Sequence, residues 1–131
     1  MRLAYFLALT PLLLSAAVQA DDCANASTQG AMNECAAKQY KQADSQLNAL
    51  YKQINSRLQD NPDSKNRLVS AQRAWVAFRD AECSFAASGV EGGSVYPMIY
   101  SGCLADLTEK RVAAFKRYLD CQEGDLSCPV R

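Results

Sequence analysis

The sequence predicts an all-α protein, an antiparallel bundle of three main helices with local disulfides. Long stretches repeat their apolar residues with a helical period, and no segment alternates at period two for long enough to form a strand. Short connections join the helical stretches, which makes consecutive helices antiparallel. Six cysteines in a chain of 131 residues add a disulfide framework to this bundle.

Residues 1–20 precede the bundle and are typical of a secretory signal peptide. Arg2 gives a positive start, residues 3–18 are mostly apolar, and small residues occupy the positions that signal peptidase recognises, Val18 and Ala20. We therefore expect cleavage after Ala20.

Two alternatives to cleavage are an uncleaved membrane anchor and a lipid anchor. The apolar run is marginal for spanning a bilayer, and the polar pair Asp21–Asp22 follows it. Cys23 does not directly follow the cleavage site, which argues against lipid attachment. We expect one domain over residues 21–131, periplasmic or secreted, without a membrane span after cleavage.

The first helix is expected from about Thr28 to about Gln59, with Ser27 or Thr28 as its N-cap. Its apolar residues recur at helical spacing, and Asp44 lies at the edge of their face. That face consists of Ala36, Tyr40, Ala43, Leu47, Leu50, Tyr51, Ile54 and Leu58.

The second helix follows a stop signal at residues 60–64, where Pro62 prevents the first helix from continuing. Asp63 or Ser64 can cap the new helix, which runs to about Ala87. Its stripe is Leu68, Gln72, Trp75, Val76, Arg79, Cys83 and Ala86, widened on one side by Ala71, Phe78 and Phe85. Arg73 and Asp80 point away from this stripe.

A glycine-rich loop at residues 88–94 separates the second helix from the third. Ser94 can cap the third helix, and Pro97 is tolerated in its first turn. The stripe of this helix is Tyr96, Tyr100, Cys103, Leu104, Leu107, Arg111, Ala114 and Tyr118, with Phe115 beside it.

The six cysteines predict three disulfides, because the chain is short and carries an export signal. Several pairings are possible, and we favour the local one: Cys23–Cys35, Cys83–Cys103 and Cys121–Cys128. A metal site is the alternative use of cysteine, but the chain has no histidine and no Cys-x-x-Cys pair. We expect no metal and no cofactor.

The composition argues against an enzyme and against a nucleic-acid partner. Without histidine the chain lacks Ser–His and Cys–His arrangements, and its carboxylates form no recognisable catalytic pair, so we expect no catalytic residue. No basic stripe with interleaved aromatics occurs, and removal of the signal peptide leaves a net charge near −1.

Polar groups on the apolar faces need partners, since an unpaired buried charge is costly. We expect a buried polar network made of Asp44, Gln72, Arg79, Glu82 and Arg111, in which Asp44 and Glu82 neutralise the two arginines. The alternative interpretation is an arginine-lined anion pocket.

Several motifs resemble one known family. They are Asp44-x-x-Leu47–Asn48-x-x-Tyr51, Gln72-x-x-Trp75-x-x-x-Arg79–Asp80-x-x-Cys83, Gly92–Gly93–Ser94, Cys103 and Leu107–Thr108-x-x-Arg111. Over about residues 23–119 the chain is similar to the lysozyme inhibitor LprI-like N-terminal domain family, long catalogued as domain of unknown function 1311. The resemblance implies an exported, helical, disulfide-linked binding protein that is not an enzyme, with lysozyme inhibition attributed to some members. The chain departs from it in the Cys121/Cys128 pair and in lacking a lipobox cysteine, so lipoprotein anchoring is not carried over.

Two functions follow from this resemblance. The first is an inhibitor that binds a lysozyme and blocks its cleft, and the second is an envelope structural or interaction protein that does not inhibit lysozyme. For an inhibitor, the glycine-rich loop is the expected contact, because a disulfide would hold both of its ends. Its candidate residues are Ser88, Glu91, Gly92, Gly93, Ser94 and Tyr96.

Overall fold

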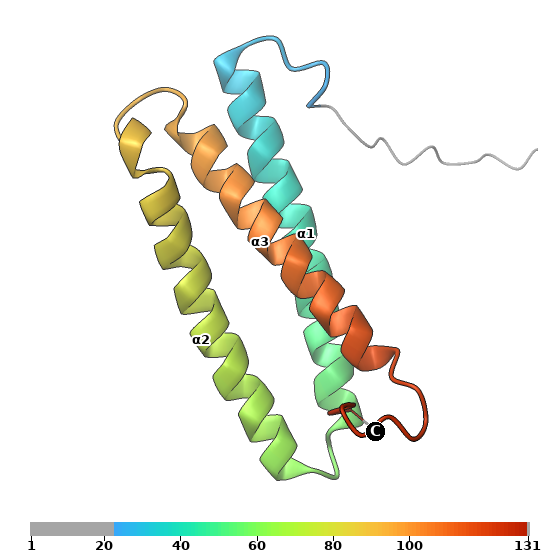
Figure 1. The fold of residues 1–131 in the computed structure, drawn as a ribbon. Coiled ribbons are helices and arrows are strands. Elements are labelled where there is room, and N and C mark those ends of the chain that lie inside the picture. Colours follow the sequence, from blue (N-terminus) through green and yellow to red (C-terminus); the bar gives the residue numbers. More distant parts are fainter. Residues whose placement is uncertain (1–22, 131) are drawn as a thin grey trace, which may run out of the picture.

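The computed structural model describes residues 23–130, which form three long helices (Figure 1). The elements are α1 at Gln29–Arg57, α2 at Pro62–Ala86, the short 3-10 helix η1 at Ser88–Val90, and α3 at Tyr96–Leu119. Helices α1 and α3 run in the same direction, and α2 runs in the opposite one. Residues 23–130 contain no strand, which confirms the predicted all-α bundle.

The expected signal peptide, residues 1–20, lies outside the described residues. None of the helices within the described part of the chain is long and apolar enough to cross a membrane.

Side-chain caps fix the starts of the first two helices. Thr28 caps α1, and its hydroxyl accepts a hydrogen bond from the backbone N–H three residues on (3.1 Å). Asn61 caps α2 by accepting from the N–H of Ser64 at 3.2 Å, so the expected cap at Asp63 or Ser64 is wrong. Pro62 can take the first helical position because that position needs no N–H partner.

The main core lies between α1 and α3, which are the most closely packed pair of helices. The buried residues at its centre are Leu47, Ile54, Leu58, Val112, Phe115 and Val130. Toward the start of α1 and α3 the buried residues become small, with Ala36 and Ala43 on α1 and Ala105 and Thr108 on α3. Small side chains allow two helix backbones to approach closely, so this end of the pair contains few large apolar groups, of which Leu104 is one.

The buried face of α3 is rotated from the predicted stripe. Its buried residues are Leu104, Ala105, Thr108, Val112 and Phe115, and Phe115, expected beside the stripe, is fully buried. The rotation arises because α3 contacts both other helices. One side of α3 packs on α1, while Cys103 and Arg111 bond to residues of α2.

Helix α2 buries little apolar surface. Within it, Arg79 and Cys83 are the buried residues, whereas Leu68, Gln72, Trp75 and Val76 are half-buried. The expectation that Ala71, Phe78 and Phe85 widen the buried stripe is wrong, because Phe78 is 55% exposed, Phe85 is 76% exposed and Ala71 is exposed as well. Helix α2 contacts the others along a narrow seam, which leaves this side open to solvent.

The cysteines pair locally, as predicted: Cys23–Cys35, Cys83–Cys103 and Cys121–Cys128. The first bridge ties the N-terminal segment to α1, and the second joins α2 to α3. The third closes the tail, whose Val130 belongs to the core cluster and is 5% exposed. Three disulfides indicate an extracytoplasmic location.

The Cys83–Cys103 bridge should contribute more stability than the Cys121–Cys128 bridge. The two bridges have sequence separations of 20 and 7 residues, and the chain-entropy model gives about 3 and about 2 kcal/mol for loops of these lengths. Urea unfolding of Cys83→Ala/Cys103→Ala and of Cys121→Ala/Cys128→Ala measures both effects. A larger loss from the tail bridge would contradict the expectation and assign the main constraint to the tail.

Candidate functional site

The candidate residues fall into two groups in the structure. The first group is the polar network inside the bundle, and the second is the loop that joins α2 to α3 at one end of it (Figure 1). The network lies between the helices, and the loop is mostly exposed to solvent.

Arg79 is the centre of the network and is only 6% exposed. Its Nη1 lies 3.6 Å from Oδ1 of Asp44 on α1 and donates to the hydroxyl of Thr108 on α3 at 3.4 Å. Its guanidinium carbon lies 5.3 Å from the ring centre of Tyr40 and 5.2 Å from that of Trp75. This single side chain therefore connects α2 to α1 through an ion pair and a cation–π contact, and to α3 through a hydrogen bond.

The expected carboxylate partners of Arg79 need one correction. Asp44 lies beside it, as expected, but Glu82 is exposed and forms no ion pair within residues 23–130. Asp80, expected to point away, accepts a 2.9 Å hydrogen bond from Nε of Arg79 instead. Sequence periodicity places Asp80 on the outer face, and it does not indicate this contact between adjacent residues.

Arg111 lies farther along the α2–α3 seam, is half-buried and has a different environment. Its Nε donates to Oε1 of Gln72 at 3.1 Å, and its guanidinium carbon lies 4.6 Å from the ring centre of Phe115 and 5.7 Å from that of Trp75. No carboxylate forms an ion pair with Arg111 in the described part of the chain. The network is thus two clusters on either side of Trp75, and only the Arg79 cluster is neutralised.

Burial affects the titration of two groups in these clusters. Burial raises the pKa of the Tyr40 phenol, although the neighbouring Arg79 acts in the opposite direction. Burial lowers the pKa of the Arg111 guanidinium, and Tyr118 opposes this effect. Both shifts mark places where the ionised form is less well solvated than in water.

The loop over residues 88–96 is exposed but closely held. The Cys83–Cys103 bridge joins the helices on either side of it, with 5.5 Å between the Cα atoms. Asn33 of α1 donates from Nδ2 to the carbonyl oxygen of Ser94 at 3.0 Å. Gly92 has φ of +78°, a conformation that favours glycine, so the turn depends on this residue.

The side chains of the loop differ in what they can offer to a partner. Ser88 is already engaged, since its hydroxyl donates to the carbonyl oxygen of Phe85 at 2.7 Å. The expectation that Ser94 caps α3 is wrong, because Val95 occupies the cap position and makes no side-chain bond there. The Ser94 hydroxyl is exposed and has no partner among the described residues, whereas Tyr96 is half-buried and stacks on Tyr100 with 5.7 Å between the ring centres.

Phe85 belongs to the same surface and was missed by the sequence interpretation. It lies in the last turn of α2, directly before the loop, and its side chain is 76% exposed. Its helical spacing matches that of the buried stripe, so no local pattern indicates its exposure.

This arrangement defines a class of small helical protein, in which disulfides and a buried arginine hold the helices and a disulfide brackets an exposed loop. The chain belongs to the lysozyme inhibitor LprI family, whose pattern matches residues 20–115. This is a family of inhibitors rather than of enzymes.

A curated relative is similar to this chain over most of its length. The chain is 36% identical over 114 residues to an uncharacterized protein of Rhizobium meliloti (strain 1021), covering 79% of this chain and 82% of the relative. No solved structure matches the chain at a significant level.

Substitutions of Arg79 should separate its packing from its charge. Arg79→Ala should cost about 3 kcal/mol, because it empties a buried volume between two aromatic rings. Arg79→Met should cost less, about 1 kcal/mol, since methionine keeps much of the volume and water can reach the two freed carboxylates. Urea unfolding gives both values.

Asp44→Asn is the matched test of the ion pair. The side chain of Asp44 is 39% exposed and Asp80 still contacts Arg79, so we expect a loss below about 1 kcal/mol. A loss at Asp44 as large as that of Arg79→Ala would show that charge, not packing, dominates this cluster.

Proposed function

We propose that this protein binds a lysozyme and blocks its cleft, and that the contact is the loop at residues 88–96 together with Phe85. The observation that carries the proposal is the loop itself, which is exposed yet held by a disulfide and by Asn33. A held loop loses little conformational freedom on binding, so more of its contact energy appears as affinity.

The chemistry of the loop suits a polysaccharide-binding cleft. Such clefts carry two carboxylates, and small groups and hydrogen-bond donors fit between them. Gly92, Gly93 and the free hydroxyl of Ser94 supply a narrow tip of this kind. Glu91 is the one charged residue of the loop, and the net charge of residues 21–131 is near −1. Attraction between the net charges of the two proteins therefore contributes little to the encounter.

Phe85 gives the proposed interface an apolar anchor. Interfaces obtain most of their affinity from a few aromatic or arginine side chains that are surrounded by polar contacts. In the structure, Phe85 and the polar loop adjoin each other in the chain and share the Ser88 hydrogen bond. The pair therefore provides an anchor with a polar rim.

The alternative function, an envelope interaction protein without lysozyme inhibition, is favoured by one observation. Phe78 is also exposed and lies two turns before Phe85 on α2, so the apolar surface extends beyond the loop.

Ser94→Ala/Tyr96→Ala should weaken inhibition about tenfold or more, because it removes the free hydroxyl and the aromatic group at the loop's end. The assay follows peptidoglycan lysis by turbidity with several lysozyme types, and circular dichroism confirms unchanged helicity. Ser56→Ala, at an exposed position on α1, is the control. An unchanged inhibition constant in the double variant would place the contact elsewhere, and no inhibition of any lysozyme by the native protein would favour the alternative function.

Phe85→Ala should weaken inhibition by about tenfold, whereas Phe78→Ala should change it by less than about threefold. Both side chains are exposed and stand on the same side of α2, so their effects on folding should be similarly small. The comparison uses the same lysis assay. Equal losses in both variants would move the interface from the loop to the side of α2.

A further inference from the structure

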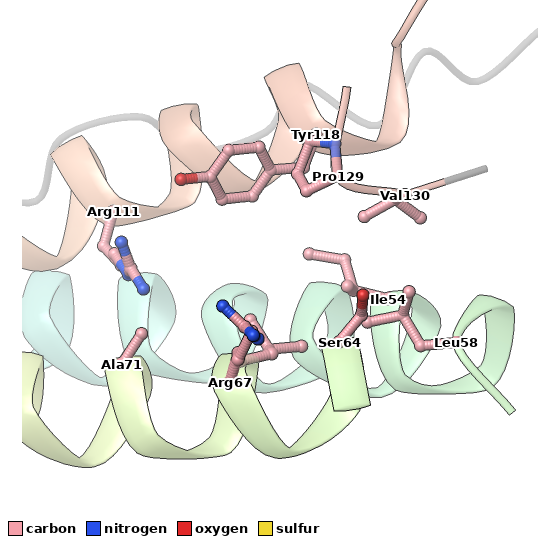
Figure 2. A pocket seen from close by; sticks show the side chains of 10 residues that line it. Ile54, Leu58, Ser64, Arg67, Ala71, Arg111, Tyr118, Pro129 and Val130 are labelled. Atoms are coloured by element: carbon pink, nitrogen blue, oxygen red, sulfur yellow. The ribbon is translucent and has the colours of Figure 1, made fainter. Parts of the chain in front are cut away.

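A pocket of about 250 Å³ opens at the end of the bundle far from the loop (Figure 2). It lies where α1 ends and α2 begins, and the end of α3 and the C-terminal tail close its other side. Its lining consists of Ile54, Leu58, Ser64, Arg67, Leu68, Ala71, Arg111, Tyr118, Pro129 and Val130.

The two ends of the pocket differ in polarity. One end is formed by Ile54, Leu58 and Val130, which are core residues with 1%, 4% and 5% exposure. Arg111 stands at the other end, and Arg67 projects between the two (Figure 2). The pocket therefore has one apolar end and one cationic end.

The positive charge of this pocket is not compensated by the protein. Neither Arg67 nor Arg111 forms an ion pair with any residue in the 23–130 range. The bond from Arg111 to Gln72 is to a neutral amide, and burial lowers the pKa of the arginine. Arg79 shows the contrast, because two carboxylates lie within ion-pair distance of it.

A ligand anion would supply the missing charge. Guanidinium groups bind carboxylate and phosphate oxygens in a planar, two-pronged geometry, and they do so most strongly where water is partly excluded. The adjoining apolar end would cover a hydrocarbon group. A cavity of about 150 Å³ is enough for benzene, so the present volume admits a short acyl chain.

We propose that this pocket binds an amphipathic anion, an acyl chain with one anionic headgroup. The headgroup contacts Arg67 and Arg111, and the chain lies against Ile54, Leu58 and Val130. Free fatty acids and membrane lipids both have this chemistry. The proposal concerns a second site, separate from the loop, and does not depend on lysozyme binding.

Trp75, the one tryptophan of the chain, reports on this site, because its ring centre lies 5.7 Å from the Arg111 guanidinium carbon. Octanoate should change the Trp75 fluorescence in a saturable way. Octanol has the same chain without the charge, and it should bind at least about tenfold more weakly because it lacks a charge-assisted contact. Equal affinities, or no saturable binding of octanoate by fluorescence and calorimetry, would overturn the proposal.

Arg67→Met should weaken octanoate binding by about threefold to tenfold. The fold should not change, since the Arg67 side chain is exposed and forms no hydrogen bond or ion pair within the described residues. Arg117→Met is the matched control, because Arg117 is exposed on α3 and does not line the pocket. Urea unfolding verifies that both variants keep the native stability. Equal affinities for octanoate in the two variants would overturn the assignment of the headgroup.

Phosphatidylglycerol vesicles distinguish the two sources of the ligand. Octanoate binding without sedimentation of the protein with vesicles identifies a free carboxylate as the ligand. Sedimentation that octanoate competes away, and that Arg67→Met reduces, identifies a lipid acyl chain. Either result supports the pocket as the site of binding.

Discussion

The fold depends on how Arg79 reaches from α2 into the bundle. Helices α1 and α3 form an apolar core that needs nothing from α2 at its centre. Helix α2 has only Arg79 and Cys83 as buried residues within its length, so apolar burial is a small part of its attachment. The guanidinium lies between the rings of Tyr40 and Trp75 and meets groups of all three helices. Helix α2 is therefore attached by one buried cation and one covalent bridge, together with half-buried contacts such as those of Leu68 and Trp75.

Trp75 lies close to both arginines of the network, Arg79 and Arg111. Its ring has the Arg79 guanidinium carbon 5.2 Å from its centre and that of Arg111 5.7 Å away. Two cations near one ring repel each other unless one of them is neutralised, and Asp44 and Asp80 do this for Arg79 alone. The guanidinium of Arg111 contacts the neutral amide of Gln72 and aromatic rings. Arginine is thus neutralised by carboxylates at position 79 on α2 and has no carboxylate partner among the described residues at position 111 on α3.

The sequence was sufficient for the parts of the fold that depend on local spacing. Helix periodicity, the proline at residue 62 and the cysteine separations are all short-range signals, and the helices and disulfides followed from them. Which neighbour each helix faces is a long-range property. Phe115 is fully buried because α3 packs on two partners, and Phe85 is exposed because α2 has only a narrow seam. A periodic stripe records that a helix has an apolar side, but not how much of that side is covered.

The candidate site shows the same division. The glycine-rich loop was visible as composition, and a bridge across it could be expected from spacing. The bond from Asn33 to the carbonyl of Ser94 joins residues 61 positions apart, and no local pattern predicts it. The same holds for Val130, which closes the core and lines the pocket although the tail reads as polar and irregular. In both cases a distant segment completes a feature that the local sequence only begins.

The placement of the covalent bridges implies that the two ends of the bundle differ in rigidity. The Cys83–Cys103 bridge and Arg79 both act on the half of α2 next to the loop. The half near Pro62 has no covalent link to α3 and meets its neighbours through half-buried contacts, including Leu68 and the Gln72–Arg111 bond. Separating the helices there exposes less apolar surface than separating α1 from α3 would, so its free-energy cost is smaller. The end of the bundle that carries the loop is thus the more constrained one, and the pocket lies at the end where α2 is held less tightly.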